Sequence, residues 1–377
     1  MISIDWQALS PIGSAVGWTI LHSLWQLTLL AFSLAFALRF VSRKRAALRY
    51  GILLAGLALA PAISGITFAW LWPGAAPGAP HFPVESAAAE TVLLPVPAPA
   101  ESDALTGDGW QALAASIDTH TPHIAIAWLI GMCGFLIYLI SGLFYLRFLQ
   151  QHQVQAPDPA WKNRFVRLCR QIGVSGKVQL LLSGKVSEPV TFRLFRPVIL
   201  IPFSLFTGLT TAQIEVLLLH ELSHIRRYDF VINLLQTLTE MLFFYHPALW
   251  WISGKIREER EHCCDDLVMA VQRNPVLYAE ALTQLQAHQL FTKKRLAMSA
   301  TGKKSLLRKR VFRLFGQYEE QPSIFKSLIM ALLLSGICFS AQGFFDHEKP
   351  KAVRDWPLEA STGSPEEAAA LAREAEA

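Results

Sequence analysis

Four stretches of the chain are apolar enough and long enough to cross a membrane as helices. They are Gly17–Leu38, Tyr50–Trp72, Ile124–Leu146 and Ser327–Phe345, and none of them contains Asp, Glu, Lys or Arg. A bilayer core needs about 20 residues of helix, so each stretch suffices. No basic region precedes the first stretch, so we do not expect it to be a cleaved signal peptide.

The charges between these stretches predict the orientation of the chain. Residues 39–49 contain five Lys or Arg, whereas residues 73–123 contain six Asp or Glu and no Lys or Arg. Basic residues favour the cytoplasmic side of a membrane. We therefore expect the protein to lie in the plasma (inner) membrane, with residues 39–49 and 147–326 on the cytoplasmic side. The N-terminus, the Pro/Ala-rich link and the C-terminal tail should lie on the external side.

The composition supports a membrane protein and excludes several other classes. Hydrophobic residues make up 52% of the chain and charged residues only 17%, whereas a soluble domain carries about 25% charged residues. The net charge of +5 is unaccompanied by a nucleic-acid recognition motif, so we expect no direct nucleic-acid contact. The five cysteines show no CxxC spacing, which argues against a disulfide scaffold.

The cytoplasmic segment has the pattern of a small α+β domain. Short apolar or β-branched runs at Lys177–Leu182, Pro189–Arg193 and Pro197–Pro202 predict strands, which we expect to form an antiparallel sheet. Thr210 with Gln213 three residues later is a capping-box pattern, so a helix should begin there.

This predicted helix carries His220-Glu221-Leu222-Ser223-His224, an HExxH motif. Residues four apart lie one above the other on a helix, so both imidazoles can reach one Zn²⁺ while Glu221 reaches a water beside it. A shuffled chain of this composition would contain roughly 0.02 such matches. The motif therefore predicts a zinc peptidase rather than two histidines on an ordinary helix.

A catalytic zinc site needs a third protein ligand. Position 230, where a longer HExxHxxGxxH motif would place a histidine, is Phe230. A later predicted helix, Ile256–Val271, carries Glu258, Glu261 and Asp265 on one face. We expect Glu261 to be the ligand and Asp265 to hold a histidine N–H; alternatively, this face is only a solvated surface.

The stretch Asp229–Ser253 is apolar enough to be considered a fifth membrane span. A crossing there would place Glu261 on the opposite side of the membrane from His220 and would export many basic residues. We therefore expect this stretch to dip into the inner leaflet, or to pack in the protease core, and then to return.

Besides the order of the four spans, the chain contains four characteristic local runs: Arg196-Pro197-Val198-Ile199-Leu200-Ile201-Pro202, His220-Glu221-Leu222-Ser223-His224-Ile225-Arg226-Arg227-Tyr228-Asp229, His246-Pro247-Ala248-Leu249-Trp250-Trp251 and Arg260-Glu261-His262-Cys263-Cys264-Asp265-Asp266. In these features the chain resembles the BlaR/MecR-type antirepressor membrane metallopeptidases over about residues 10–345.

The resemblance implies a multi-pass α-helical membrane protein with a cytoplasmic α+β zincin-like (gluzincin) metalloprotease domain. It implies that His220, His224 and Glu261 bind Zn²⁺ and that Glu221 is the general base. An external signal would reach the protease through the helices, and the protease would cleave a transcriptional repressor or its own chain. The expected parts are 1–72 (membrane helices 1 and 2), 73–123 (external linker), 124–149 (membrane helix 3), 150–324 (protease domain), 325–345 (membrane helix 4) and 346–377 (external tail).

Some features leave alternatives open. Residues 346–377 carry no SxxK motif, so we do not expect direct β-lactam sensing. The strand near Val198–Ile201 is a candidate edge for a peptide substrate, or only a core strand. The basic run at 303–313 is a self-cleavage segment, a lipid contact or a solvated helix face.

Two rival functions remain. One is quality control of membrane proteins, as in HtpX/Ste24-like proteases, and the other is a non-catalytic membrane signal transducer. The expected partners are a protein substrate and the lipid bilayer, and the sequence carries no signal for an oligomeric state.

Overall fold

A computed structural model describes residues 6–72, 108–174, 177–192, 196–292 and 300–318. Three of its helices are long and apolar enough to cross a membrane: α1 (Trp6–Phe40), α2 (Ala46–Leu71) and α3 (Asp108–Gln151). They coincide with the first three expected stretches. The fourth expected span, the tail and residues 73–107 of the linker lie outside the described residues.

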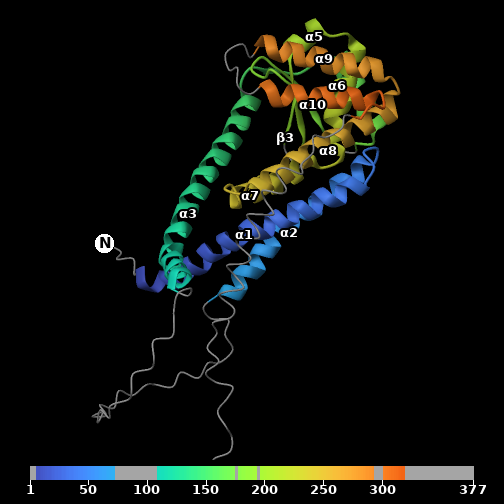
Figure 1. Ribbon diagram of the computed structural model, residues 1–377. Coiled ribbons are helices and arrows are strands. Elements are labelled where there is room, and N and C mark those ends of the chain that lie inside the picture. The colour runs from blue at the N-terminus through green and yellow to red at the C-terminus, as the bar shows by residue number, and fades with distance from the viewer. Residues whose placement is uncertain (1–5, 73–107, 175–176, 193–195, 293–299, 319–377) are drawn as a thin grey trace, which may run out of the picture.

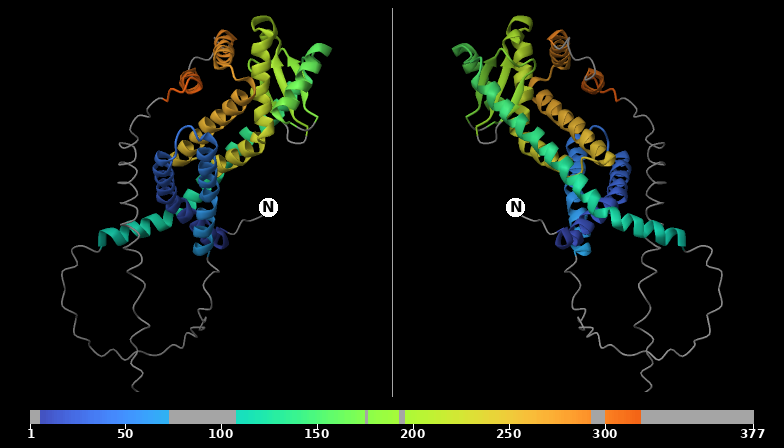
Figure 2. Two further views of the ribbon diagram at one scale, coloured as in Figure 1. Left: turned by 90° about the vertical axis from the view of Figure 1, so that its right-hand side faces the viewer. Right: turned by 90° about the vertical axis from the view of Figure 1, so that its left-hand side faces the viewer.

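The long helices extend from one side of a smaller mixed domain (Figures 1 and 2). α1 and α2 form an antiparallel pair with a buried seam that includes Leu27 and Leu53. α3 approaches α1 closely, because Gly17 lies against the backbone of Thr121 and has no room for a side chain. Elsewhere α3 exposes large apolar side chains such as Ile137 and Phe144, as a surface that faces lipid would.

The domain contains a four-stranded sheet in the order β1-β2-β4-β3. Its strands are β1 (Val154–Gln155), β2 (Gln179–Ser183), β3 (Val190–Phe192) and β4 (Val198–Pro202). The expectation of an antiparallel sheet is wrong for the central pair, because β2 and β4 are parallel. The chain passes beyond the position of β4 to form β3 and then turns back, so β4 is inserted between β2 and β3.

The helices of the domain pack against this sheet or against one another. They are α4 (Pro159–Ile172), α5 (Phe203–Gly208), α6 (Thr211–Arg226), α9 (Pro275–Thr292) and α10 (Ala300–Leu314). α6 begins with the expected capping box, in which Thr210 accepts a hydrogen bond from the backbone of Gln213 and the Gln213 side chain accepts one from Thr210. The main core joins Ile199 and Ile201 of β4 to Leu218 of α6. α6 is thereby fixed against the sheet.

Helices α7 (Asp229–Leu242) and α8 (Pro247–Gln272) form a hairpin that enters the bundle of long helices (Figure 1). Near its tip, Trp128 of α3 donates a hydrogen bond to the carbonyl of Leu242 at 2.8 Å. The Tyr245 hydroxyl lies 2.7 Å from that of Ser23, near the middle of α1. The chain therefore turns back within the stretch Asp229–Ser253, and α8 returns along α2 to the domain.

Candidate metal centre

The two histidines of the HExxH motif lie side by side on α6. Their ring centroids are 4.8 Å apart, as residues one helical turn apart should be. His220 is only 7% exposed. The buried apolar residues that flank it on α6, Leu218 and Leu222, anchor this part of the helix in the domain core.

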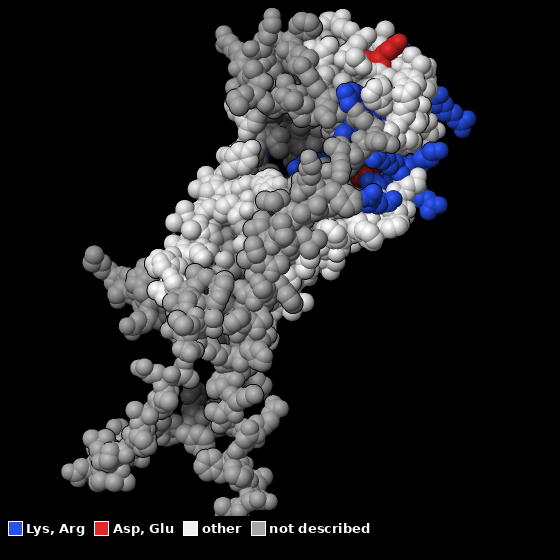
Figure 3. Space-filling model, in the orientation of Figure 1, with Lys and Arg blue, Asp and Glu red and all other residues white. Residues whose placement is uncertain are grey.

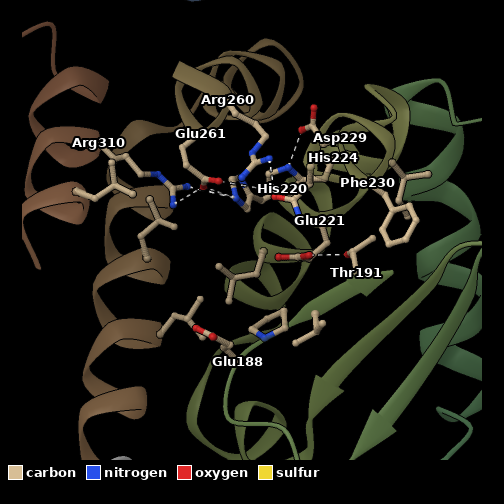
Figure 4. A pocket seen from close by; sticks show the side chains of 18 of the residues that line it. Glu188, Thr191, His220, Glu221, His224, Asp229, Phe230, Arg260, Glu261 and Arg310 are labelled. Carbon is tan, nitrogen blue, oxygen red and sulfur yellow. Dashed lines mark hydrogen bonds and ion pairs between the residues drawn. The ribbon is translucent and has the colours of Figure 1, made fainter. Parts of the chain in front are cut away.

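The carboxylate of Glu261 reaches both imidazoles from α8. One oxygen lies 3.4 Å from Nε2 of His220 and the other 3.9 Å from Nε2 of His224, and the three side chains offer ligand atoms that all lie within 4.8 Å of one another. Two atoms bound to one tetrahedral Zn²⁺ are about 3.3 Å apart. The donor set of two imidazoles and one carboxylate therefore fits a divalent metal (Figure 4).

Glu221 lies beside these residues but is held by a different partner. The hydroxyl of Thr191 on β3 donates to its Oε2 at 2.6 Å, and Figure 4 shows the Glu221 carboxylate pointing into the cavity below His220. The side chain is thus oriented from the sheet and remains separate from the imidazole–carboxylate group.

Asp229 orients His224, and the sequence analysis missed this role. Its Oδ2 lies 2.8 Å from Nδ1 of His224, and the thiol of Cys264 lies 3.3 Å from the same nitrogen. Tyr228, with φ of 55°, makes the left-handed turn after α6 that brings Asp229 back to the histidine. Burial opposes the charged imidazole, but Cys264, Asp229 and Glu261 together raise the pKa of His224 well above its usual value.

Tyr278 of α9 orients His220. Its hydroxyl lies 2.9 Å from Nδ1 of His220 and donates to Oδ1 of Asp265 at 2.6 Å. Asp265 itself is 3.7 Å from that nitrogen, so the expected contact with a histidine N–H is made through Tyr278. Burial and the neighbouring Asp265 carboxylate raise the pKa of Tyr278 well above its usual value, and its hydroxyl remains protonated.

Arg310 of α10 closes the other side of the site. It bonds to both oxygens of Asp265, at 2.7 and 3.0 Å, and lies 3.1 Å from Oε2 of Glu261. Burial acts against the charge of Glu261, yet His220 and Arg310 lower its pKa well below the usual value. Glu261 is therefore ionised, as a metal ligand must be.

The structure gives the basic run of α10 a further role beside the three considered from sequence. Arg310 is part of the site, Lys309 pairs with Glu258 at 3.1 Å and Arg313 pairs with Asp266 at 2.6 Å. These residues bind acidic side chains of α8 rather than forming a freely solvated face. Glu258 also pairs with Lys255 on its own helix and does not join the histidines.

A cavity of about 690 Å³ opens in front of these side chains. Its lining includes an apolar part with Leu217 of α6 and with Leu282 and Leu285 of α9, and a polar part with Arg260 and Asn233. This volume is within the range of typical ligand pockets. The site therefore has room for a segment of another chain.

The sheet edge beside the cavity is β3, and of the two alternatives for Val198–Ile201 the structure confirms the core strand. β4, which contains Val198–Ile201, pairs with β2 on one side and with β3 on the other, so it offers no free edge. β3 is the last strand in the sheet order of the described residues, and its Val190 and Thr191 line the cavity.

Comparison with known proteins identifies relatives of this chain. The sequence model of the family described as BlaR1 peptidase M56 matches residues 81–314. The methicillin resistance MecR1 protein of Staphylococcus aureus (strain Mu50 / ATCC 700699) is 23% identical over 166 residues, which cover 43% of this chain and 28% of that protein. The regulatory protein BlaR1 of Bacillus licheniformis is 26% identical over 144 residues, covering 38% of this chain and 24% of the relative. The matched segments thus span less than a third of the length of these relatives.

Proposed function

The chain belongs to the BlaR1 peptidase M56 family, and on this premise we propose that it is a multi-pass membrane zinc endopeptidase with a zincin-like active site on the cytoplasmic side. One observation carries the proposal: His220, His224 and Glu261 present their ligand atoms to one another within 4.8 Å, and Glu221 points into the adjoining cavity. A metal-binding group beside a carboxylate that does not itself bind the metal is the arrangement that peptide hydrolysis by a zinc enzyme requires.

In this proposal His220, His224 and Glu261 bind the metal, and neighbouring residues orient the two histidines. Asp229 contacts Nδ1 of His224 and Tyr278 contacts Nδ1 of His220, so Nε2 of each ring is the nitrogen left to bind the ion in place of a proton. A bound Zn²⁺ would polarise the scissile carbonyl and lower the pKa of a water molecule.

Glu221 is the group of this chain that moves the proton. Its carboxylate accepts the proton of the attacking water and delivers it to the leaving amine nitrogen of the peptide. Thr191 donates to Oε2, which leaves Oε1 free to face the cavity. The bond broken is the peptide C–N bond, and the water supplies the oxygen of the new carboxylate.

The substrate is an extended segment of a protein chain. β3 is the edge strand at the cavity, and an extended peptide can add to such an edge through backbone hydrogen bonds. The apolar wall formed by Leu217, Leu282 and Leu285 would receive an apolar side chain. Such a site would recognise the extended backbone of the substrate mainly through hydrogen bonds, and its side chains to a lesser extent.

The position of the domain relative to the basic residues supports the proposed orientation, in which the active site faces the cytoplasm. The basic segment 39–49, which includes the turn between α1 and α2, contacts α8, because Arg49 at the beginning of α2 pairs with Glu259. On the face seen in Figure 3, Lys and Arg gather over the domain on the side where α8, α10 and this turn lie. Basic residues concentrate on the cytoplasmic side of membranes, so we place the active site there.

The biological substrate that we propose is a cytoplasmic regulatory protein, such as a transcriptional repressor, or the chain itself. The relatives named above are described as a regulatory protein and as a methicillin resistance protein. A protease at the membrane fits signal transmission to a soluble regulator.

A proteome comparison tests this function. Cells that express the wild-type chain or Glu221→Gln are compared in their membrane and cytosolic fractions, with and without the inducing condition. We expect a protein fragment that forms only with the wild type. If Glu221→Gln transmits the signal as well as the wild type, the protein is instead a non-catalytic transducer. If the wild type produces many fragments of misfolded membrane proteins, it is a quality-control protease.

A further inference from the structure

We propose that Arg49 and Tyr50, at the beginning of α2, are positioning residues that connect the membrane helices to two different ligands of the metal centre. A displacement of α2 would then change the affinity of the site for its metal. This inference rests on the proposed function, because it takes His220, His224 and Glu261 to be the ligands.

Arg49 makes the first connection. It is 7% exposed and its partner Glu259 on α8 is 4% exposed, and its Nε donates to a carboxylate oxygen of Glu259 at 2.5 Å. Its Nη1 donates to the carbonyls of Leu38 and Val41 at 2.8 and 3.0 Å. One guanidinium thus joins the C-terminal end of α1, the beginning of α2 and α8.

The position of Glu259 on α8 makes this pair relevant to the site. Glu259 precedes Glu261 by two residues in the middle of a continuous helix. A helix moves as a rigid element over so short a distance, so a shift of the Arg49–Glu259 pair along or around α8 also moves the Glu261 carboxylate. The ligand is therefore coupled to the turn between the first two membrane helices.

Tyr50 makes the second connection, by a separate route. Its ring lies below the guanidinium of Arg227, with 4.7 Å from the guanidinium carbon to the ring centroid. Nε of Arg227 lies 3.4 Å from Oδ1 of Asp229, and the other oxygen of Asp229 holds Nδ1 of His224. The ring thus supports the residue that orients His224.

The two routes begin at neighbouring residues of α2 and end at ligands on different helices. The first half of α2 is packed against α8, since Leu53 and Leu57 share a buried cluster with Ile252 and Ile256. A piston or rotation of α2 would therefore change the relative placement of α6 and α8. Because the metal needs ligands from both helices, this placement sets its affinity.

The test measures the affinity of the purified full-length chain for Zn²⁺, in nanodiscs, by competition with a chromogenic chelator. The variants are Arg49→Gln, Glu259→Gln and their double variant, together with Tyr50→Leu and Tyr50→Phe. Loss of a group that orients a ligand typically weakens metal binding 10–100-fold, so we expect about a tenfold loss for each single variant except Tyr50→Phe. The double variant should be no weaker than either single one, because both remove the same contact.

Tyr50→Phe keeps the ring below Arg227 and should bind Zn²⁺ as the wild type does. The control for a general loss of stability is Arg257→Gln, which breaks the 2.6 Å ion pair with Glu240. That pair joins α7 to α8 without involving α2, so the variant should keep the wild-type affinity.

Equal Zn²⁺ affinity of wild type, Arg49→Gln and Tyr50→Leu would overturn the inference, even if the melting temperatures of the variants fell. If Arg49→Gln does not fold, the comparison of Tyr50→Leu with Tyr50→Phe decides, and equal affinity of these two overturns it. A wild-type chain that binds no Zn²⁺ would refute the proposed function itself.

Discussion

The carboxylate of Asp229 lies 2.8 Å from Nδ1 of His224, and this contact determines which ring nitrogen carries the proton. A carboxylate accepts a hydrogen bond from Nδ1–H, so Nε2, on the side of Glu261, is the nitrogen that would give up its proton to bind a metal. Tyr278 acts in the same way on His220. Each histidine of the motif is thus oriented by a residue from outside α6.

Replacement of Asp229 should weaken metal binding without unfolding the domain. In Asp229→Asn the amide can donate to Nδ1 and so favours the wrong tautomer, and we expect Zn²⁺ affinity to fall about tenfold or more. The matched control is Asp266→Asn, which removes a carboxylate that pairs with Arg313 at the surface. Chelator competition on both variants checks this, and equal affinities would contradict the assigned role of Asp229.

Tyr278→Phe should separate an effect on the metal from an effect on stability. The variant loses a buried hydroxyl that joins His220 to Asp265, so both the melting temperature and the Zn²⁺ affinity should fall. Tyr245→Phe is the control, since it loses the partly buried hydroxyl that bonds to Ser23 far from the site. Each lost hydrogen bond costs about 1 kcal/mol of stability, but only Tyr278→Phe should change metal affinity. A similar Zn²⁺ affinity of Tyr278→Phe and Tyr245→Phe would contradict the assigned role of Tyr278.

Thr191→Val should lower turnover while leaving metal binding intact. The substitution keeps the shape of the side chain and removes the donor to Glu221, and loss of a hydrogen bond to a charged group costs about 1.5–3 kcal/mol. We expect kcat to fall about tenfold or more, and Thr191→Ser to retain most of it. Steady-state cleavage of a peptide substrate measures this. A loss of metal rather than of kcat would show that Glu221 is a ligand.

The link between α8 and α10 should be sensitive to acid. Although burial opposes ionisation, Lys255 and Lys309 lower the pKa of Glu258 from 4.5 to about 2. A carboxyl whose pKa is lower in the folded state stabilises that state above its unfolded pKa, and the stabilisation is lost as the pH falls from about 4.5 through about 2. The melting temperature of Glu258→Gln should therefore lie below that of the wild type at neutral pH and approach it in acid. A difference that does not depend on pH would contradict this assignment.

The features that depend on local pattern could be predicted from the sequence. Three of the long apolar helices and the capping box of α6 follow from composition and spacing along the chain. The placement of Glu261 near the two histidines could also be predicted, because a zinc site with an HExxH motif needs a third ligand and a later helix offers this carboxylate.

The residues that orient the ligands could not be predicted in the same way. Asp229 contacts His224 only because of the left-handed turn at Tyr228. Tyr278 and Arg310 lie on α9 and α10, which pack against α6 and α8. The parallel pairing of β2 and β4 likewise depends on where the chain inserts a strand. Such contacts arise from tertiary packing and have no local periodicity.

The metal content of Glu261→Ala and Glu258→Ala, measured by mass spectrometry beside the wild type after purification of the full-length chain, tests the central claim most directly. We expect about one zinc ion per chain in the wild type and in Glu258→Ala, and little or none in Glu261→Ala. Zinc retained by Glu261→Ala but lost from Glu258→Ala, or absent from the wild type, would contradict it.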